Sequence, residues 1–271
     1  MLLFSKKHKS WFDFLFAMTQ KEIKVRYKNA VLGFLWILIN PIIQMLVIGF
    51  LFQYFIKLSV ENYYLYLFAG LLAWEFFSYS LSKVTQSIVF ERTLIKKAYF
   101  PREAIVLSII LSNAFHMIVS YLLFIVALGI YRMIWFSISP VDSIVNSLVI
   151  IVQCMPYIFL LLIFCSGLGL ITSSLNVKYR DVNFVVKALL PVWFYSTPVI
   201  YQLGMLPEKT SELISKLNPM AFIINGIRSA VLQNHGGDIS LAIVPMIIIL
   251  ATALLGIIVF KNQSKLFDDW I

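Results

Sequence analysis

Six long apolar runs are the feature that most constrains how this chain can fold. They cover residues 30–55, 62–82, 104–131, 143–171, 184–202 and 240–260. A helix needs about 20 apolar residues to cross roughly 30 Å of hydrocarbon, and inside lipid a helix satisfies its own backbone hydrogen bonds. Hydrophobic residues make up 61% of the 271-residue chain, too large a share for a soluble domain of this length. We therefore predict an all-α membrane protein with six transmembrane helices over residues 30–271.

The distribution of basic residues predicts the orientation of these helices. Most of the 22 Lys and Arg residues fall before the first run, in two connecting segments and in the tail after the last run. The exceptions are Lys57, Arg132, Lys209, Lys216 and Arg228. Because basic residues concentrate on the cytoplasmic side, we expect both termini and the connecting segment 83–103 to be cytoplasmic. The net charge of +9 is then a property of the topology, and we expect no nucleic-acid partner.

The segment before the first run, residues 1–29, predicts an amphipathic helix at the cytoplasmic interface. Trp11, Phe14, Leu15 and Met18 fall near one helical face, with lysines elsewhere.

The segment 203–239 is expected on the opposite side of the membrane. Within it, "NPMAFIINGIRSAVLQ" begins with Asn218 as a helix N-cap and Pro219 in the first turn. A helix of this length is about 22 Å long, too short to span the bilayer. We expect it to re-enter the outer leaflet or to cover a pore mouth, with Arg228 either reaching the headgroups or meeting a passing anion.

The cytoplasmic segment 83–103 is longer than a turn between two helices requires. It contains "LIKKAYFPRE", in which basic and aromatic residues surround Pro101. We predict a short helix over residues 86–97, anchored by Ile88, Val89, Leu94 and Ile95, that docks on a soluble protein. Enforcement of topology alone would explain its charges but not its apolar residues.

Catalytic motifs are absent from the sequence. There is no GxxxxGK[ST], HExxH or GxSxG, and His8, His116 and His235 are scattered. We therefore expect neither an enzyme nor a metal or cofactor site on this chain. Glu75 is the acidic residue that lies well inside an apolar run. Because a buried carboxylate is costly there, Glu75 either faces a channel or reaches toward the cytoplasmic end of its helix.

Aromatic residues make up 15% of the chain, and several lie inside the runs rather than at their ends. Flat aromatic faces suit a sugar chain that slides through a wet pore. Aromatic belts at the membrane surface are the alternative. The fifth run also contains Pro191 and Pro198, which favours a bent helix that lines a cavity over one that faces lipid.

Four stretches carry a resemblance to a known family. They are "KEIKVRYKNAVLGFLWILINPIIQ", "LIKKAYFPREAIVL", "NVKYRDVNFVVKALLPVWFYSTPVIY" and "LNPMAFIINGIRSAVLQ". In this order they resemble permeases of type-2 ABC transporters, and within these the bacterial exporters of O-antigen, capsule and teichoic acid. The resemblance implies a homodimer in the bacterial cytoplasmic membrane that exports a lipid-linked polysaccharide. It also implies two separate nucleotide-binding subunits, which would use ATP and Mg.

The resemblance, together with the features above, assigns candidate residues to four roles. The ATPase-coupling residues are Glu91, Arg92, Leu94, Ile95, Lys96, Lys97, Phe100, Pro101, Arg102, Tyr179, Arg180 and Asp181. The channel-lining residues are Trp36, Gln44, Trp74, Glu75, Phe76, Tyr79, Trp193 and Tyr195. The substrate-entrance residues are Arg26, Lys28 and Arg180, for which the positive-inside rule alone is an alternative explanation. The outer-gate residues are Pro219, Met220, Phe222, Ile223, Ile227 and Arg228.

Three other functions remain open at this point. The same architecture could export a drug or a lipid. A self-sufficient secondary transporter would show internal repeats and several intramembrane charges, which the sequence does not show clearly. A structural scaffold would not need a fifth run interrupted by two prolines.

Overall fold

The computed structural model describes residues 2–28, 35–56, 62–97, 100–233 and 242–267, and these ranges contain helices and no β-strand. The longer helices are α1 (Leu2–Tyr27), α2 (Trp36–Phe50), α3 (Tyr63–Phe90), α5 (Glu103–Phe136), α6 (Pro140–Lys178), α7 (Val182–Ser196), α9 (Pro219–Leu232) and α10 (Ile243–Ser264). The shorter ones are the π-helix η2 (Leu51–Ile56), α4 (Arg92–Lys97), the 3₁₀ turn η3 (Leu203–Met205) and α8 (Glu208–Leu217). The architecture is the all-α one that the sequence predicts.

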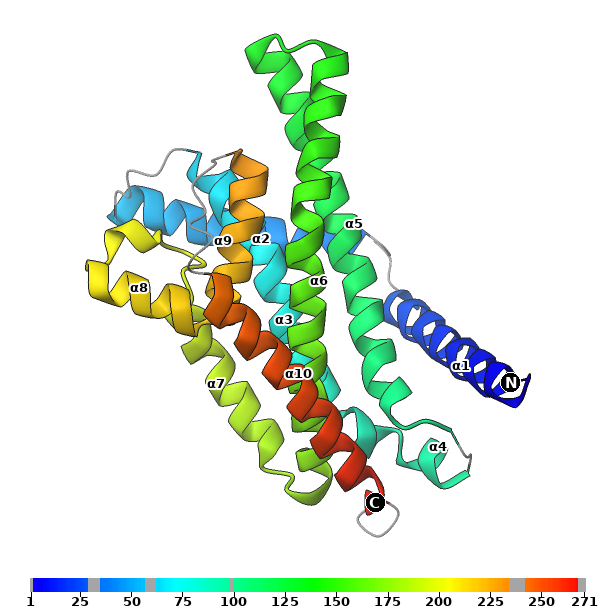
Figure 1. The fold of residues 1–271 in the computed structure, drawn as a ribbon. Helices are drawn as coiled ribbons and strands as arrows, with labels where there is room; N and C mark the ends of the chain where they lie inside the picture. Colours follow the sequence, from blue (N-terminus) through cyan, green and yellow to red (C-terminus); the bar gives the residue numbers. More distant parts are fainter. Residues whose placement is uncertain (1, 29–34, 57–61, 98–99, 234–241, 268–271) are drawn as a thin grey trace.

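Among the residues that the structure describes, four helices are long and apolar enough to cross a membrane. They are the continuous stretch Trp36–Phe55, α5, α6 and α10. In Figure 1, α5 and α6 form a long hairpin whose tip extends beyond the other helices, while α4 and the C-terminal end of α10 lie together at the opposite end. The segments that we predict to be cytoplasmic therefore gather at one end of the bundle. Arg102 joins them by donating a hydrogen bond to the carbonyl of Ser264.

Helix α3 corresponds to the second apolar run and forms the centre of the fold. It contacts α2, α5, α6, α7 and α9, and 18 of its 28 residues are buried. Because α3 is surrounded largely by protein, it tolerates tyrosines, serines and Glu75, which lower its hydropathy below that of the lipid-facing helices.

Helix α7 ends six residues before the fifth predicted run does. The prediction of a span over 184–202 is therefore wrong at its C-terminal end. Thr197 adopts an extended conformation with φ −100° and ψ 137°, as expected for a residue that precedes proline. Pro198 itself lacks the N–H that a continuing helix would need. Pro41, Pro156 and Pro191, by contrast, lie inside helices without ending them.

The predicted helix over 86–97 is divided in the structure. Its first half is the end of α3, which continues to Phe90. A turn at Glu91 follows, and α4 begins at Arg92. Residues 86–97 therefore form the end of the central helix followed by one short helix.

Helices α6 and α10 pack closely because glycines face each other where they cross. A Cβ atom on Gly256 would lie 2.4 Å from the backbone oxygen of Gly167, and one on Gly167 would lie 2.7 Å from the Cα of Ala253. Because backbone atoms cannot move aside as a side chain can, an added methyl group would force the two helices apart.

We expect Gly256→Ala to destabilise the protein by about 1–3 kcal/mol through overpacking. The measurement is the thermal unfolding midpoint of the purified protein in detergent. Gly204→Ala is the matched control, because nothing lies within 4 Å of a Cβ atom built there. Equal midpoints for the two variants would contradict the close packing of α6 against α10.

Candidate functional site

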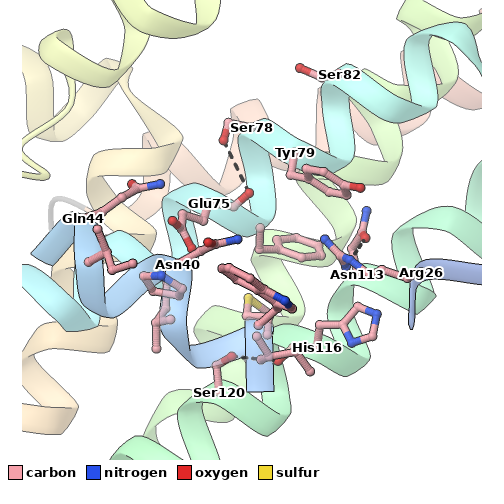
Figure 2. A pocket seen from close by; sticks show the side chains of 17 residues that line it. Arg26, Asn40, Gln44, Glu75, Ser78, Tyr79, Ser82, Asn113, His116 and Ser120 are labelled. Atoms are coloured by element: carbon pink, nitrogen blue, oxygen red, sulfur yellow. Dashed lines mark hydrogen bonds between the residues drawn. The ribbon is translucent and has the colours of Figure 1, made fainter. Parts of the chain in front are cut away.

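A cavity of about 750 Å³ lies between α2, α3 and α5, with the C-terminal end of α1 at its edge (Figure 2). Its polar lining residues are Arg26, Asn40, Gln44, Glu75, Ser78, Tyr79, Ser82, Asn113, His116 and Ser120. Its apolar lining residues are Trp36, Ile37, Pro41, Ile43, Leu72, Phe76 and Met117. Since three of its walls are helices that correspond to apolar runs, this is a polar cavity at membrane depth.

Helical periodicity explains why each helix supplies several lining residues. On α3, Leu72 is followed by Glu75, Phe76 and Tyr79, at spacings of three, four and seven. The α5 residues Asn113, His116, Met117 and Ser120 repeat the same spacing. On α2, the residues Trp36, Asn40 and Gln44 are four apart. Residues with these spacings lie on one face of a helix, so each helix turns a partly polar face to the cavity.

Arg26 is held at the edge of the cavity by two neighbours. Its Nη1 donates a hydrogen bond to Oδ1 of Asn113 at 3.0 Å, and its guanidinium lies over the Tyr79 ring, 4.4 Å from the centroid. The Asn113 amide is oriented in turn, because its Nδ2 donates to Oγ of Ser80 at 3.0 Å. Cation–π contacts and hydrogen bonds of this kind fix a guanidinium whose side chain is otherwise flexible.

The remainder of α1 is attached to the C-terminal end of α3 and to the segment around α4. Nζ of Lys21 lies 2.6 Å from Oε1 of Glu91, and Nζ of Lys83 lies 2.7 Å from Oε2 of Glu22. The ring of Phe14 stacks on the ring of Phe100, with 4.7 Å between centroids. One helix therefore contacts both the cytoplasmic segment and, through Arg26, the cavity.

The eight predicted channel-lining residues divide into two groups. Five of them line the cavity, namely Trp36, Gln44, Glu75, Phe76 and Tyr79. Glu75 lies in the cavity wall, and its role in a channel stays a prediction. Three lie elsewhere: Trp74, Trp193 and Tyr195.

Trp74 and Trp193 belong to a packed aromatic cluster rather than to the cavity. Trp74 is 6% exposed, and its ring packs against those of Phe77 and Phe194. Trp193 packs against Phe77 and donates its Nε1–H to Oδ1 of Asn218. The placement of Trp74 in a channel wall is therefore wrong for this chain, because α3 turns it toward α7. Tyr195 is 67% exposed and lies outside the cavity.

The predicted ATPase-coupling residues lie mainly at the end of the bundle that we predict to be cytoplasmic. Arg92 and Lys96 are exposed, Leu94 is partly buried and Ile95 is buried. Tyr179, Arg180 and Asp181 are exposed in the turn between α6 and α7. The partly buried remainder consists of Glu91, Phe100, Pro101 and Arg102, while the side chain of Lys97 lies outside the described residues.

Phe90 is an exposed aromatic residue that our sequence reasoning missed. It ends α3, immediately before the turn at Glu91, and it is 76% exposed. Ile88, which the sequence reasoning named as an anchor, is fully buried. An aromatic residue beside charged ones at the end of a long helix is the signal that could have identified Phe90.

The substrate-entrance residues are separated in the structure. Arg26 reaches the cavity, whereas Lys28 and Arg180 are exposed and do not line it.

The outer-gate residues on α9 are mostly buried. Pro219, Met220, Ile223 and Ile227 pack into the core, and Phe222 contacts the ring of Tyr157. Arg228 is 3% exposed, so in this structure it neither reaches the headgroups nor is open to a passing anion, the two alternatives that the sequence left.

Comparisons with known proteins identify similar chains over most of the sequence. Residues 14–232, which include the cavity and α9, match the family described as ABC-2 type transporter. An O-antigen export system permease protein RfbA of Klebsiella pneumoniae is 34% identical over 213 residues, 79% of this chain and 78% of the relative. The RfbA of Myxococcus xanthus is 30% identical over 95% of both chains. The polysialic acid transport protein KpsM of Escherichia coli is 21% identical over 92% of this chain and 93% of the relative.

We expect the cavity to admit water, which cysteine labelling can test. Ser78 lines the cavity and Ser80 is fully buried two residues along the same helix. In a background with Cys154 and Cys165 replaced by alanine, Ser78→Cys should react with a small water-soluble maleimide at least about tenfold faster than Ser80→Cys. Equal labelling rates would show that the cavity is closed to water.

Proposed function

This chain belongs to the ABC-2 type transporter family, as the resemblance in its sequence predicted, and we propose that it is the membrane permease of an ATP-driven polysaccharide exporter. The observation that carries the proposal is the similarity to an O-antigen export permease, which is 30% identical over 95% of both chains. The similarity to a polysialic acid transport protein supports the same class of cargo. The cargo that we propose is a lipid-linked polysaccharide of the O-antigen, capsule or teichoic acid type.

The cavity has the chemistry that a sugar chain requires. Trp36 and Tyr79, both exposed in the cavity wall, offer aromatic surface to sugar rings, and such contacts do not fix a hydrogen-bond register. Asn40, Gln44 and Ser78 offer donors and acceptors to hydroxyl groups. An apolar drug or a lipid tail would use the aromatic faces but would leave the amide groups without partners. The mixture of groups therefore favours a glycan.

We propose that two copies of the chain enclose the path of the polysaccharide in the bacterial cytoplasmic membrane, with both termini in the cytoplasm. Helix α2 supports this assignment, because Asn40 and Gln44 are exposed on a helix that is otherwise apolar and little buried. Polar groups at membrane depth require a protein or water neighbour. A second copy would supply that neighbour.

ATP hydrolysis, with its Mg, is assigned to two separate nucleotide-binding subunits. We propose that they dock on the surface formed by Phe90, Arg92, Thr93 and Lys96, which we name the α3–α4 surface. All four residues are exposed in the structure, and a protruding aromatic residue surrounded by polar ones is typical of a binding hot spot.

At the cytoplasmic entrance we propose that Arg26 receives the anionic phosphate of the lipid carrier. A guanidinium can form two parallel charge-assisted bonds to a phosphate, which an ammonium group cannot reproduce. Its position at the edge of the cavity allows this contact without a change in fold. Lys28 and Arg180 remain candidates for guiding the headgroup from the membrane surface.

Depletion of the chain in its native bacterium tests the proposed function. Surface polysaccharide should disappear, and lipid-linked polysaccharide should accumulate on the cytoplasmic side. A normal amount of surface polysaccharide after depletion would rule out the proposal.

We expect Phe90→Ser to weaken binding of the ATPase subunit. Loss of an aromatic hot spot costs at least about 2 kcal/mol, which corresponds to about 30-fold weaker binding. The measurements are the affinity of the purified ATPase for the reconstituted permease and the permease-stimulated ATPase rate. Phe136→Ser is the matched control, because Phe136 is 67% exposed and ends α5, and the tip of the α5–α6 hairpin lies at the opposite end of the bundle from α4 (Figure 1). If both variants bind the ATPase like the wild type, the α3–α4 surface is not the docking site.

We expect Arg26→Lys to weaken binding of the lipid-linked substrate by about tenfold, or about 1.4 kcal/mol. The substitution keeps the positive charge, so topology should be unchanged while the two-bond contact is lost. Lys24→Gln is the control, since Lys24 is exposed on α1 and outside the cavity. Unchanged substrate affinity in Arg26→Lys would favour the explanation that this residue only enforces topology.

A further inference from the structure

Four consecutive carbonyl groups follow the end of α7 and accept hydrogen bonds from side chains of other helices. The hydroxyl of Tyr63 donates to the carbonyl of Ile200 at 2.9 Å, and the hydroxyl of Tyr66 donates to that of Tyr201 at 2.9 Å. The two preceding carbonyls, of Pro198 and Val199, accept from Nη1 and Nη2 of Arg228. Each of these four carbonyls, from Pro198 to Tyr201, therefore accepts a hydrogen bond from a side chain of α3 or α9.

Arg228 connects this stretch to α3 as well. Its Nε donates to the carbonyl of Tyr66 at 2.9 Å, and its Nη1 donates to the Tyr66 hydroxyl at 2.7 Å. The guanidinium also lies over the Tyr66 ring, 3.6 Å from the centroid. Helix α3 has Gly70 at the same place, where a Cβ atom would lie only 2.4 Å from Nη2 of Arg228. We name these bonds, together with those to Pro198 and Val199, the Arg228 contact set.

The Arg228 contact set is a costly way to hold helices together. In the part of the chain that the structure describes, no carboxylate forms an ion pair with Arg228. A buried cation without a counter-charge is expensive, so an apolar residue would serve better if α9 only had to be packed. The apolar side chains of Met220, Ile223 and Ile227, all fully buried, already provide that packing. The guanidinium instead supplies several donors in one fixed plane, and these meet the non-helical stretch.

We infer that Arg228 is a positioning residue that holds α9 closed against α3 and the stretch 197–202. The inference rests on the proposed function and on the outer-gate role that the sequence analysis predicts for residues of α9. Opening of the exit then requires the whole Arg228 contact set to break together, because one guanidinium joins all three elements. The three elements α3, α9 and residues 197–202 would therefore separate from one another as one event rather than bond by bond.

The test is the passive ion leak of liposomes that contain the full-length chain without ATP. Arg228→Lys keeps the charge but cannot reproduce the planar set of donors, and Tyr66→Phe keeps the ring but removes the hydroxyl. Each variant should leak at least about tenfold faster than the wild type. Arg132→Lys is the matched control, because Arg132 is partly buried near α9 and makes one long bond, 3.4 Å, to the carbonyl of Val231.

A second control separates positioning from general stability. Gly256→Ala is expected to lower the unfolding midpoint while leaving the Arg228 contact set intact, so its liposomes should leak no faster than the wild type. Wild-type leak in a folded Arg228→Lys or Tyr66→Phe protein would overturn the inference. An ion leak in Gly256→Ala as fast as that of Arg228→Lys and Tyr66→Phe would also overturn the inference. The assay needs neither ATPase nor polysaccharide, so failure of export in the complete complex would count against the proposed function separately.

Discussion

A backbone carbonyl at membrane depth must accept a hydrogen bond, and this requirement organises the protein around the end of α7. Pro198 prevents the helix from continuing, which leaves the following carbonyls without helical donors. Side chains from α3 and α9 replace those donors, so both helices must lie beside the break. Gly70 on α3 makes room for the guanidinium that completes the arrangement. The central position of α3, and therefore of the cavity beside it, follows from this local requirement.

The elements that the sequence predicts best are those whose length the bilayer sets. The runs that became α2, α5, α6 and α10 were recognisable because lipid requires about 20 apolar residues in succession. The N-cap at Asn218 was predictable because it depends only on neighbouring residues. The Asn218 side chain accepts a hydrogen bond from the backbone N–H of Met220 at 3.1 Å. The break after Ser196 was harder to place, because Pro191 on the same helix does not cause one. Its position depends on donors from distant helices.

The direction in which each side chain faces was much less predictable. Trp74 and Phe76 are two residues apart, or about 200° around the helix, so one packs against α7 while the other lines the cavity. The sequence analysis predicted that both residues line a channel, because composition contains no information on how α3 is rotated about its own axis. Arg228 was misplaced because a basic residue in a short apolar helix is expected to seek water, and its actual partners lie 162 and about 30 residues away in sequence. Phe90 was overlooked because its exposure depends on where α3 ends.

The attachment of α1 at two places has a thermodynamic consequence. The helix contacts the cytoplasmic segment through Phe14 and Lys21 and the cavity through Arg26. Suppose that a protein bound to the cytoplasmic segment and a ligand bound in the cavity each favour a different position of α1. Their binding free energies are then coupled, and linkage requires each to change the affinity of the other by the same factor. A filled cavity would thus be detectable at the segment around α4 as a changed affinity for the protein bound there.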